Sequence, residues 1–183
     1  MRLTTTGDEN VAIGKESMLD NSTGAGNVAI GQESLSNNTT ASENVAIGKL
    51  SMNVNTTGGA NTAVGYQSLR LGTTGGSNTA LGNYAMRNQT TGSENTAVGR
   101  DALAANTTGA LNVALGNNAL DANTTASYNT AVGVNAMSAN TTGTQNAAFG
   151  KSAMETIVNG NYNTALGAYS MRLSTSSSRN VAV

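Results

Sequence analysis

The sequence contains no cysteine, no histidine and no proline. Without cysteine the chain forms no disulfide bonds, and cysteine usage therefore does not indicate a redox compartment. Without histidine and cysteine it lacks the usual general base, the common nucleophile partners and the ligand sets of zinc sites. Its carboxylates, among them Glu16, Glu33, Asp101 and Asp121, stand at variable positions and form no pairs. The sequence predicts that the protein is not an enzyme and has no catalytic residue, metal site or cofactor.

Large side chains are scarce as well, with no tryptophan, one phenylalanine and five tyrosines. Aromatic side chains supply much of the buried surface of compact cores. A chain this poor in them must bury its small aliphatic side chains in thin stacked layers or between copies of itself. The composition favours a fibre.

The charge content is low and balanced: the sequence has nine Lys and Arg residues and ten Asp and Glu residues, which gives a formal net charge of −1. The basic residues are scattered, whereas binding to phosphate backbones needs a clustered basic stripe. We therefore expect no nucleic-acid partner. No run of about 18 apolar residues predicts a membrane span, and residues 1–7 lack the basic-then-apolar order of a signal peptide. We expect that the chain is a fragment of a longer fibre, or that its targeting signal lies elsewhere.

A pentapeptide of the form Asn-(Val/Thr/Ala)-Ala-(aliphatic or Phe)-Gly recurs every 17 residues without insertion or deletion. Its first residue forms the Asn column: Asn10, Asn27, Asn44, Asn61, Asn78, Asn95, Asn112, Asn129, Asn146 and Asn163. A truncated eleventh copy begins at Asn180. Such strict phasing indicates a solenoid with one coil per repeat. We expect one repeat domain over residues 1–183, with ten full repeats from Asn10 to Arg179.

Two columns of the repeat contain no polar residue. The aliphatic column, third after each Asn, consists of Ile13, Ile30, Ile47, Val64, Leu81, Val98, Leu115, Val132, Phe149, Leu166 and Val183. The Met/Leu column, fourth after each Gly, consists of Met18, Leu35, Met52, Leu69, Met86, Leu103, Leu120, Met137, Met154 and Met171. We expect both columns to form the core.

Each repeat is too short for a helical hairpin, because each helix would have only about two turns and would contain residues that weaken helices. The segment after each Asn instead alternates larger and smaller side chains, as a strand does. The sequence therefore predicts an all-β fold, a parallel β-solenoid or β-roll of 17-residue coils. With strands stacked about 4.8 Å apart, the Asn column would form a structural ladder of hydrogen-bonded amides.

The segment between the Met/Leu column and the next Asn is polar and dominated by Asn-Thr-Thr-Gly, as at 55–58 and 106–109. Because Gly and Asn supply the backbone angles of tight corners, we expect this segment to turn the chain. Its two adjacent Thr columns begin at Thr5 and Thr6. They are interpreted as structural corner ladders; the alternative is an ice-binding array, which would require Thr at alternate positions of a strand.

One coil buries too little apolar surface to offset the entropy lost in ordering it. An invariant Ala stands second after each Asn, and an invariant Gly ends each complete pentapeptide. Small residues permit the close approach of another backbone. We therefore expect the strand face with Ala and Gly to pack against other chains near a symmetry axis, in an obligate homotrimer.

The segment Asn10-Val11-Ala12-Ile13-Gly14, followed by Ser17, resembles the head repeat of YadA-type trimeric autotransporter adhesins. The 17-residue repeat with its Asn-Thr-Thr-Gly corner is similar to repeats of phage tail fibres and bacterial surface fibres, which often precede an endosialidase-type intramolecular chaperone. The resemblance covers the whole chain. It implies a left-handed homotrimeric β-roll, extracellular on a bacterial surface or a virion, that serves adhesion. The YadA-type repeat is shorter, so the additional residues must enlarge a corner or an outer strand.

The least constant positions directly follow each pentapeptide. Variation within a constant frame marks the exposed face of a solenoid. If this segment contacts a partner such as a host receptor or glycan, the candidates are Tyr66, Tyr84 and Tyr169, whose amphipathic rings suit a contact surface. The alternative is surface drift without function. The alternative function is a monomeric solenoid that binds carbohydrate, or ice through its Thr columns.

Overall fold

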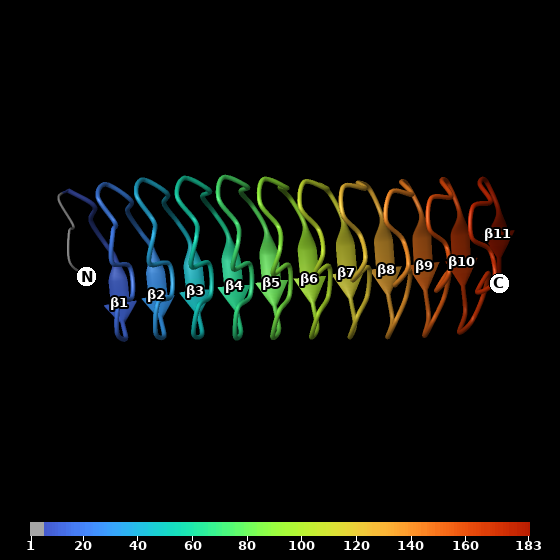
Figure 1. Cartoon of the computed structure of the whole chain (residues 1–183), viewed down its shortest axis with the longest axis horizontal. Helices are drawn as coiled ribbons and strands as arrows, with labels where there is room; N and C mark the ends of the chain where they lie inside the picture. Colours follow the sequence, from blue (N-terminus) through green and yellow to red (C-terminus); the bar gives the residue numbers. More distant parts are fainter. Residues whose placement is uncertain (1–5) are drawn as a thin grey trace.

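The computed structural model describes residues 6–183, so Thr5 and the predicted start of the domain lie outside the described residues. The chain winds into a rod of stacked coils, with the N-terminus at one end and the C-terminus at the other (Figure 1). Each coil contributes one short strand to a single parallel sheet in the order of the sequence. The strands are β1 (Val11–Ile13), β2 (Val28–Ile30), β3 (Val45–Ile47), β4 (Thr62–Val64), β5 (Thr79–Leu81), β6 (Thr96–Val98), β7 (Val113–Leu115), β8 (Thr130–Val132), β9 (Ala147–Phe149), β10 (Thr164–Leu166) and β11 (Val181–Ala182).

The register between coils follows the repeat without a shift. Ala12 pairs with Ala29, and the same 17-residue offset holds along the sheet to Ala165 and Ala182. The predicted parallel β-solenoid of 17-residue coils is confirmed. Within residues 6–183 no helix is present, and hence none that is long and apolar enough to cross a membrane.

Each strand ends because the glycine that follows it leaves the extended conformation. In this column φ lies between 125° and 139°, a region that side chains rarely adopt. A Cβ on Gly65 would also lie 2.5 Å from the carbonyl oxygen of Gly82 in the next coil. The stacking of coils therefore requires glycine here, which accounts for its constancy in the pentapeptide.

The corners are turned largely by residues other than glycine. Each complete coil contains further positive-φ positions, for example Glu43 (φ 61°), Leu50 (φ 59°) and Met52 (φ 49°). The expectation that glycine of the Asn-Thr-Thr-Gly segment supplies unusual backbone angles is wrong, because Gly58 and Gly109 are not among the positive-φ residues.

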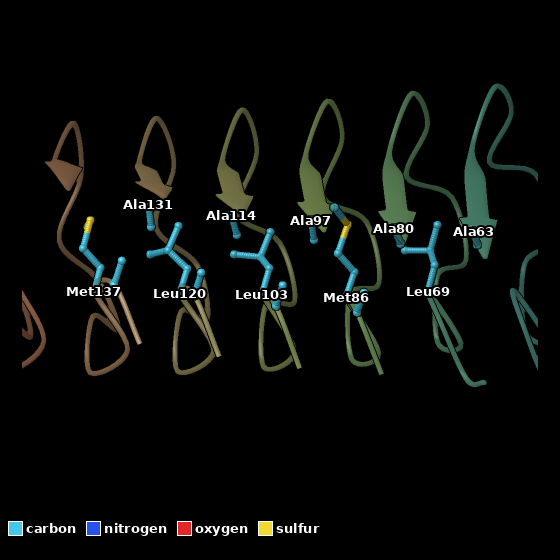
Figure 2. Close-up of a cluster of buried hydrophobic side chains, with 14 of the residues drawn as sticks. Ala63, Leu69, Ala80, Met86, Ala97, Leu103, Ala114, Leu120, Ala131 and Met137 are labelled. Carbon is cyan, nitrogen blue, oxygen red and sulfur yellow. The ribbon is translucent and has the colours of Figure 1, made fainter. Parts of the chain in front are cut away.

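The core lies between the strand and the Met/Leu column. In Figure 2 the labelled Met and Leu side chains point toward the Ala residues of the strands. From Met18 to Met154 the Met/Leu column is buried, with at most 2% of each residue exposed, and Met171 is half-buried. The prediction that this column forms core is confirmed.

The prediction that the aliphatic column is core is wrong. No described member of it is buried, and Ile13 is 58% exposed. The alternation along the strand is as predicted, but the large side chains point outward and Ala points inward. The reason is space: the Met/Leu column already fills the interior of each coil, and opposite it there is room only for a methyl group.

It follows that the Ala-bearing strand face does not meet other chains. Ala29 through Ala165 of this column are fully buried inside their own coils. Small residues here permit the close approach of the two walls of a single coil. Any contact with another chain through the sheet must use the opposite face.

Two columns of amide side chains complete the interior. In the Asn column, the backbone N–H of each Asn donates to Oδ1 of the Asn one coil earlier, as from Asn78 to Asn61 at 2.9 Å. Its Nδ2 reaches a carbonyl of the following corner, as from Asn78 to Gly92 O at 3.0 Å. The Asn side chains thus tie strand to corner and coil to coil, as a structural ladder does.

A second amide ladder lies in the corner and is also buried. This corner ladder consists of Asn21, Asn38, Asn55, Gln89, Asn106, Asn123 and Asn140. Asn38 Nδ2, for example, donates to Asn21 Oδ1 at 2.7 Å and to Ala41 O at 2.9 Å. Gly72 and Ile157 stand at the same position of their coils and interrupt the ladder.

Candidate interaction surfaces

The outward side of the sheet is a continuous uncharged surface of aliphatic side chains, Phe149 and Thr, which we call the outer strand face. It is formed by the aliphatic column and by the residues directly after each Asn, which are Val, Thr or Ala. Leu81, Phe149 and Leu166 are 45%, 39% and 53% exposed on it. Neither column contains a charged residue in any coil. Contiguous exposed faces of this kind are often functional on soluble proteins.

The first Thr column is engaged within the solenoid. Thr39 Oγ1 donates to the carbonyl of Thr56 at 3.1 Å, and the same bond recurs from Thr56 to Thr73 and from Thr90 to Thr107. The second Thr column, which includes Thr40 and its equivalents up to Thr142, is exposed. The first column therefore acts as the structural corner ladder that was expected, and one exposed rank of hydroxyls remains.

The three predicted tyrosines lie on the corner that follows the strands. Tyr66 and Tyr169 are 37% and 48% exposed, and Tyr84 is half-buried. The structure brings Tyr66 and Tyr84 together, with ring centroids 5.3 Å apart in an edge-to-face arrangement. Tyr169 lies five coils further along the rod, so it belongs to a separate surface.

Cations lie over these rings. The guanidinium of Arg87 is 5.3 Å from the ring centroid of Tyr84, and that of Arg172 is 5.4 Å from Tyr169. Lys151 Nζ lies 5.6 Å from the Tyr169 ring as well. Arg172 also pairs with Glu155 at 2.7 Å.

The arginines were missed by the sequence analysis, although the sequence carries a signal for them. Tyr84-Ala85-Met86-Arg87 and Tyr169-Ser170-Met171-Arg172 are the same tetrapeptide, Tyr-(Ala/Ser)-Met-Arg, at the same phase of the repeat. In both copies Met is the core residue, and Tyr and Arg flank it on the outside. We call each pair of Tyr and Arg a Tyr-Arg pair.

Another group of exposed apolar and aromatic residues was not singled out from the sequence. Leu111, Tyr128 and Tyr162 precede the Asn of their coils and are 40%, 61% and 53% exposed. Arg179 lies 5.9 Å from the Tyr162 ring centroid. This group lies on the corner before the strand, and the Tyr-Arg pairs lie on the corner after it.

The carboxylates do not assemble into a site in the part of the chain that the structure describes. Among residues 6–183 no three Asp or Glu side chains are close enough to hold a metal ion. Burial raises the pKa of Asp121, backbone hydrogen bonds from Asp121 and Ala122 lower it, and the charge of Asp101 raises it. The net effect is an increase, and Asp121 Oδ1 is buried without a hydrogen-bond partner.

A hollow of about 690 Å³ is lined by Tyr169, Met171, Arg172, Leu173 and Ser174. It lies beside the tenth coil, where coil eleven stops at Val183 and leaves Met171 partly uncovered.

We found no match to this chain among protein families, curated proteins or solved structures.

Proposed function

We propose that this chain is a structural and adhesive segment of a homotrimeric surface fibre, in which the outer strand faces of three copies pack around a common axis. The observation that carries the proposal is the uncharged outer strand face, whose aliphatic column runs along the whole sheet. In this arrangement the aliphatic column, which is exposed in the single chain, would be buried between chains.

The size of the face supports this arrangement. Strands of three residues are about 10 Å long, and eleven of them stacked about 4.8 Å apart give a surface on the order of 500 Å² per chain. Apolar patches of this size on soluble proteins commonly mark interaction sites. In a trimer each chain meets two others, so the outer strand face and its rims would all be covered.

The resemblance to YadA-type adhesin heads and to tail-fibre repeats supports three chains rather than two, and a left-handed winding. It also supports an extracellular location, on a bacterial surface or a virion. The segment would then project or present host attachment, as an adhesin head or shaft or a tail fibre does. The absence of histidine and cysteine from the sequence supports a function other than catalysis.

The alternative is a monomeric solenoid that binds carbohydrate, or ice through its Thr columns, and its ice-binding form has less support. An ice-binding plane needs free hydroxyls, and those of the first Thr column donate to carbonyls of the next coil. A monomer would also leave the outer strand face in water.

The test is the mass of the chain in solution, measured by light scattering after size exclusion. A mass three times the chain mass of 18.3 kDa is expected. A mass near that of one chain would overturn the homotrimer.

A further inference from the structure

We propose that the two Tyr-Arg pairs, with the polar residues beside them, bind an acidic polysaccharide along the outer side of the rod. This inference names a ligand class for the adhesive segment and rests on the proposed function. It starts from the same aromatic and cationic pair at the same phase of two coils, half-buried at Tyr84 and Arg87 and exposed at Tyr169 and Arg172.

The surface around Tyr84 has the parts that sugar rings require. The edge-to-face contact places the exposed ring of Tyr66 beside the half-buried ring of Tyr84, and aromatic rings offer an apolar surface with a polar end. Gln67 Nε2 donates to the hydroxyl of Tyr66 at 2.9 Å, and the backbone N–H of Tyr66 donates to Asn83 Oδ1 at 3.2 Å. These amides have further donors and acceptors for the hydroxyl groups of a sugar.

Two arginines of neighbouring coils favour an anion on the same surface. Arg70 and Arg87 occupy the same position of adjacent coils, so their backbones are about 4.8 Å apart. Both lie in turns, and like charges at equivalent positions of neighbouring coils repel each other. Arg70 Nε is buried without a hydrogen-bond partner, and Arg87 Nε donates to Asn88 Oδ1 at 3.3 Å. A carboxylate or sulfate group would relieve the repulsion and accept from a guanidinium.

Few acidic groups compete for the cations around Tyr84, whereas at the second pair Arg172 already pairs with Glu155 and Lys151 supplies the further cation. Arg100, on the next coil, has Asp101 as its partner at 3.5 Å, with 62% of the arginine side chain exposed. Counting Arg70, Arg87, Arg100 and Asp101, the surface carries a formal charge of +2, although the chain as a whole carries −1. The ligand that fits is therefore anionic.

The second pair makes a polymer the better match than a single sugar. Tyr169 and Arg172 follow Tyr84 and Arg87 by five coils, about 24 Å along the rod. Each pair alone offers few contacts and would bind weakly. A chain with regularly spaced acidic groups can reach both pairs, and in a trimer three sets of pairs, which raises the apparent affinity without new contacts.

The experiment measures binding of the full chain to immobilised hyaluronan, a polymer with one carboxylate per disaccharide, in about 0.15 M salt. Dextran, a neutral polysaccharide, and poly-glutamate, an acidic polymer without sugars, are the comparison surfaces. We expect binding to hyaluronan at least about tenfold tighter than to either. Equal binding to poly-glutamate would reduce the interaction to charge alone and overturn the inference, as would a lack of binding to hyaluronan.

The chain offers a matched control variant. Tyr84→Ala combined with Arg87→Ala is expected to weaken hyaluronan binding about tenfold. Tyr162→Ala combined with Arg179→Ala removes a similar aromatic and cationic pair on the other corner and should leave binding within about twofold of the unmodified chain. Equal losses in both variants would overturn the assignment to the Tyr-Arg pairs.

The two proposals fail in different ways. None of these substitutions touches the outer strand face, and the mass of each sample is measured on the same material. A trimer that does not bind hyaluronan overturns the ligand class and leaves the fibre intact. A monomer that binds hyaluronan overturns the homotrimer and leaves the proposal of an acidic polysaccharide ligand intact.

Discussion

At the scale of single residues, Asp121 is held where its charge is disfavoured. Its pKa is raised in the folded chain, chiefly by burial, so the native state binds the proton more tightly than the unfolded state does. The charge therefore costs stability as pH rises above the ordinary aspartate pKa of about 3.9, up to and through the raised value. Below that range the cost is absent.

Asp121→Asn should accordingly stabilise the chain at pH 7, by less than about 1 kcal/mol because the residue remains partly exposed to water. At pH 3 the variant and the unmodified chain should have the same stability. The free energy of unfolding in urea at both pH values checks this. An equal difference at pH 3 and pH 7 would show that the charge of Asp121 is not the cause.

Glu43 has an unfavourable backbone conformation. It is exposed, with φ 61°, and its backbone N–H donates to Ala25 O at 3.0 Å. Gly26 stands at the same position one coil earlier with φ 65°, and a Cβ there would meet nothing within 4 Å. The side chain at Glu43 therefore contributes strain without a compensating contact from its Cβ.

Glu43→Gly should stabilise the chain by about 0.5–1 kcal/mol, the difference between relieved left-handed strain and the added freedom of glycine in the unfolded state. Glu43→Ala, which keeps the Cβ, serves as the control and should change stability by less than about 0.5 kcal/mol. Urea unfolding measures both. If the Gly variant were no more stable than the Ala variant, the strain would be absent.

At the scale of elements, the corner ladder is weakest where a coil supplies no amide. Gly72 interrupts it between Asn55 and Gln89. The other interruption shows the effect directly: Asn140 Oδ1 is buried without a partner, because Ile157 stands at the next position of the ladder.

Gly72→Asn should restore the ladder and raise the free energy of unfolding by about 1–2 kcal/mol. By analogy with Asn106, its amide would donate to Asn55 Oδ1 and to Gly75 O. The new Cβ would lie 3.1 Å from Leu69 Cγ, which must move slightly. Gly72→Ala separates the backbone effect from the hydrogen bonds, and equal stability of the two variants would contradict the ladder argument.

For the strands, the sequence predicted how the coils stack but not which side chains face the core. The 17-residue phase predicted the solenoid, its register and the buried Met/Leu column. The predicted direction of the strand was wrong, with the aliphatic column placed inward, because Ala and Ile are both apolar and alternation alone has no direction. In the structure, Met and Leu point toward Ala across the coil and form the buried cluster with it (Figure 2).

The corner residues were less predictable for a related reason. The sequence indicated that Tyr66, Tyr84 and Tyr169 are on the variable side, but not that Arg87 and Arg172 lie over the rings. Those contacts depend on the conformation of the turn between Tyr and Arg, where Met86 has φ 50°. A positive φ at a methionine is not expected from its residue type.

At the scale of the whole molecule, the outer strand face decides the assembly. Val98→Lys combined with Val132→Lys would place two lysines on this face in every chain, and six around the axis of a trimer. Burying unpaired charges costs several kcal/mol each, so we expect this variant to be monomeric by light scattering. The interior of each coil is unchanged, so circular dichroism should still show β structure.

The matched control replaces two exposed valines elsewhere. Val134 and Val158 are 44% and 38% exposed and lie on the corners after and before the strand. Val134→Lys combined with Val158→Lys adds the same charge without touching the outer strand face, so its mass should remain three times that of the chain. A trimer with lysines at 98 and 132 would mean that the copies associate through another surface, and the exposed group at Leu111, Tyr128 and Tyr162 would then be the next interface to test.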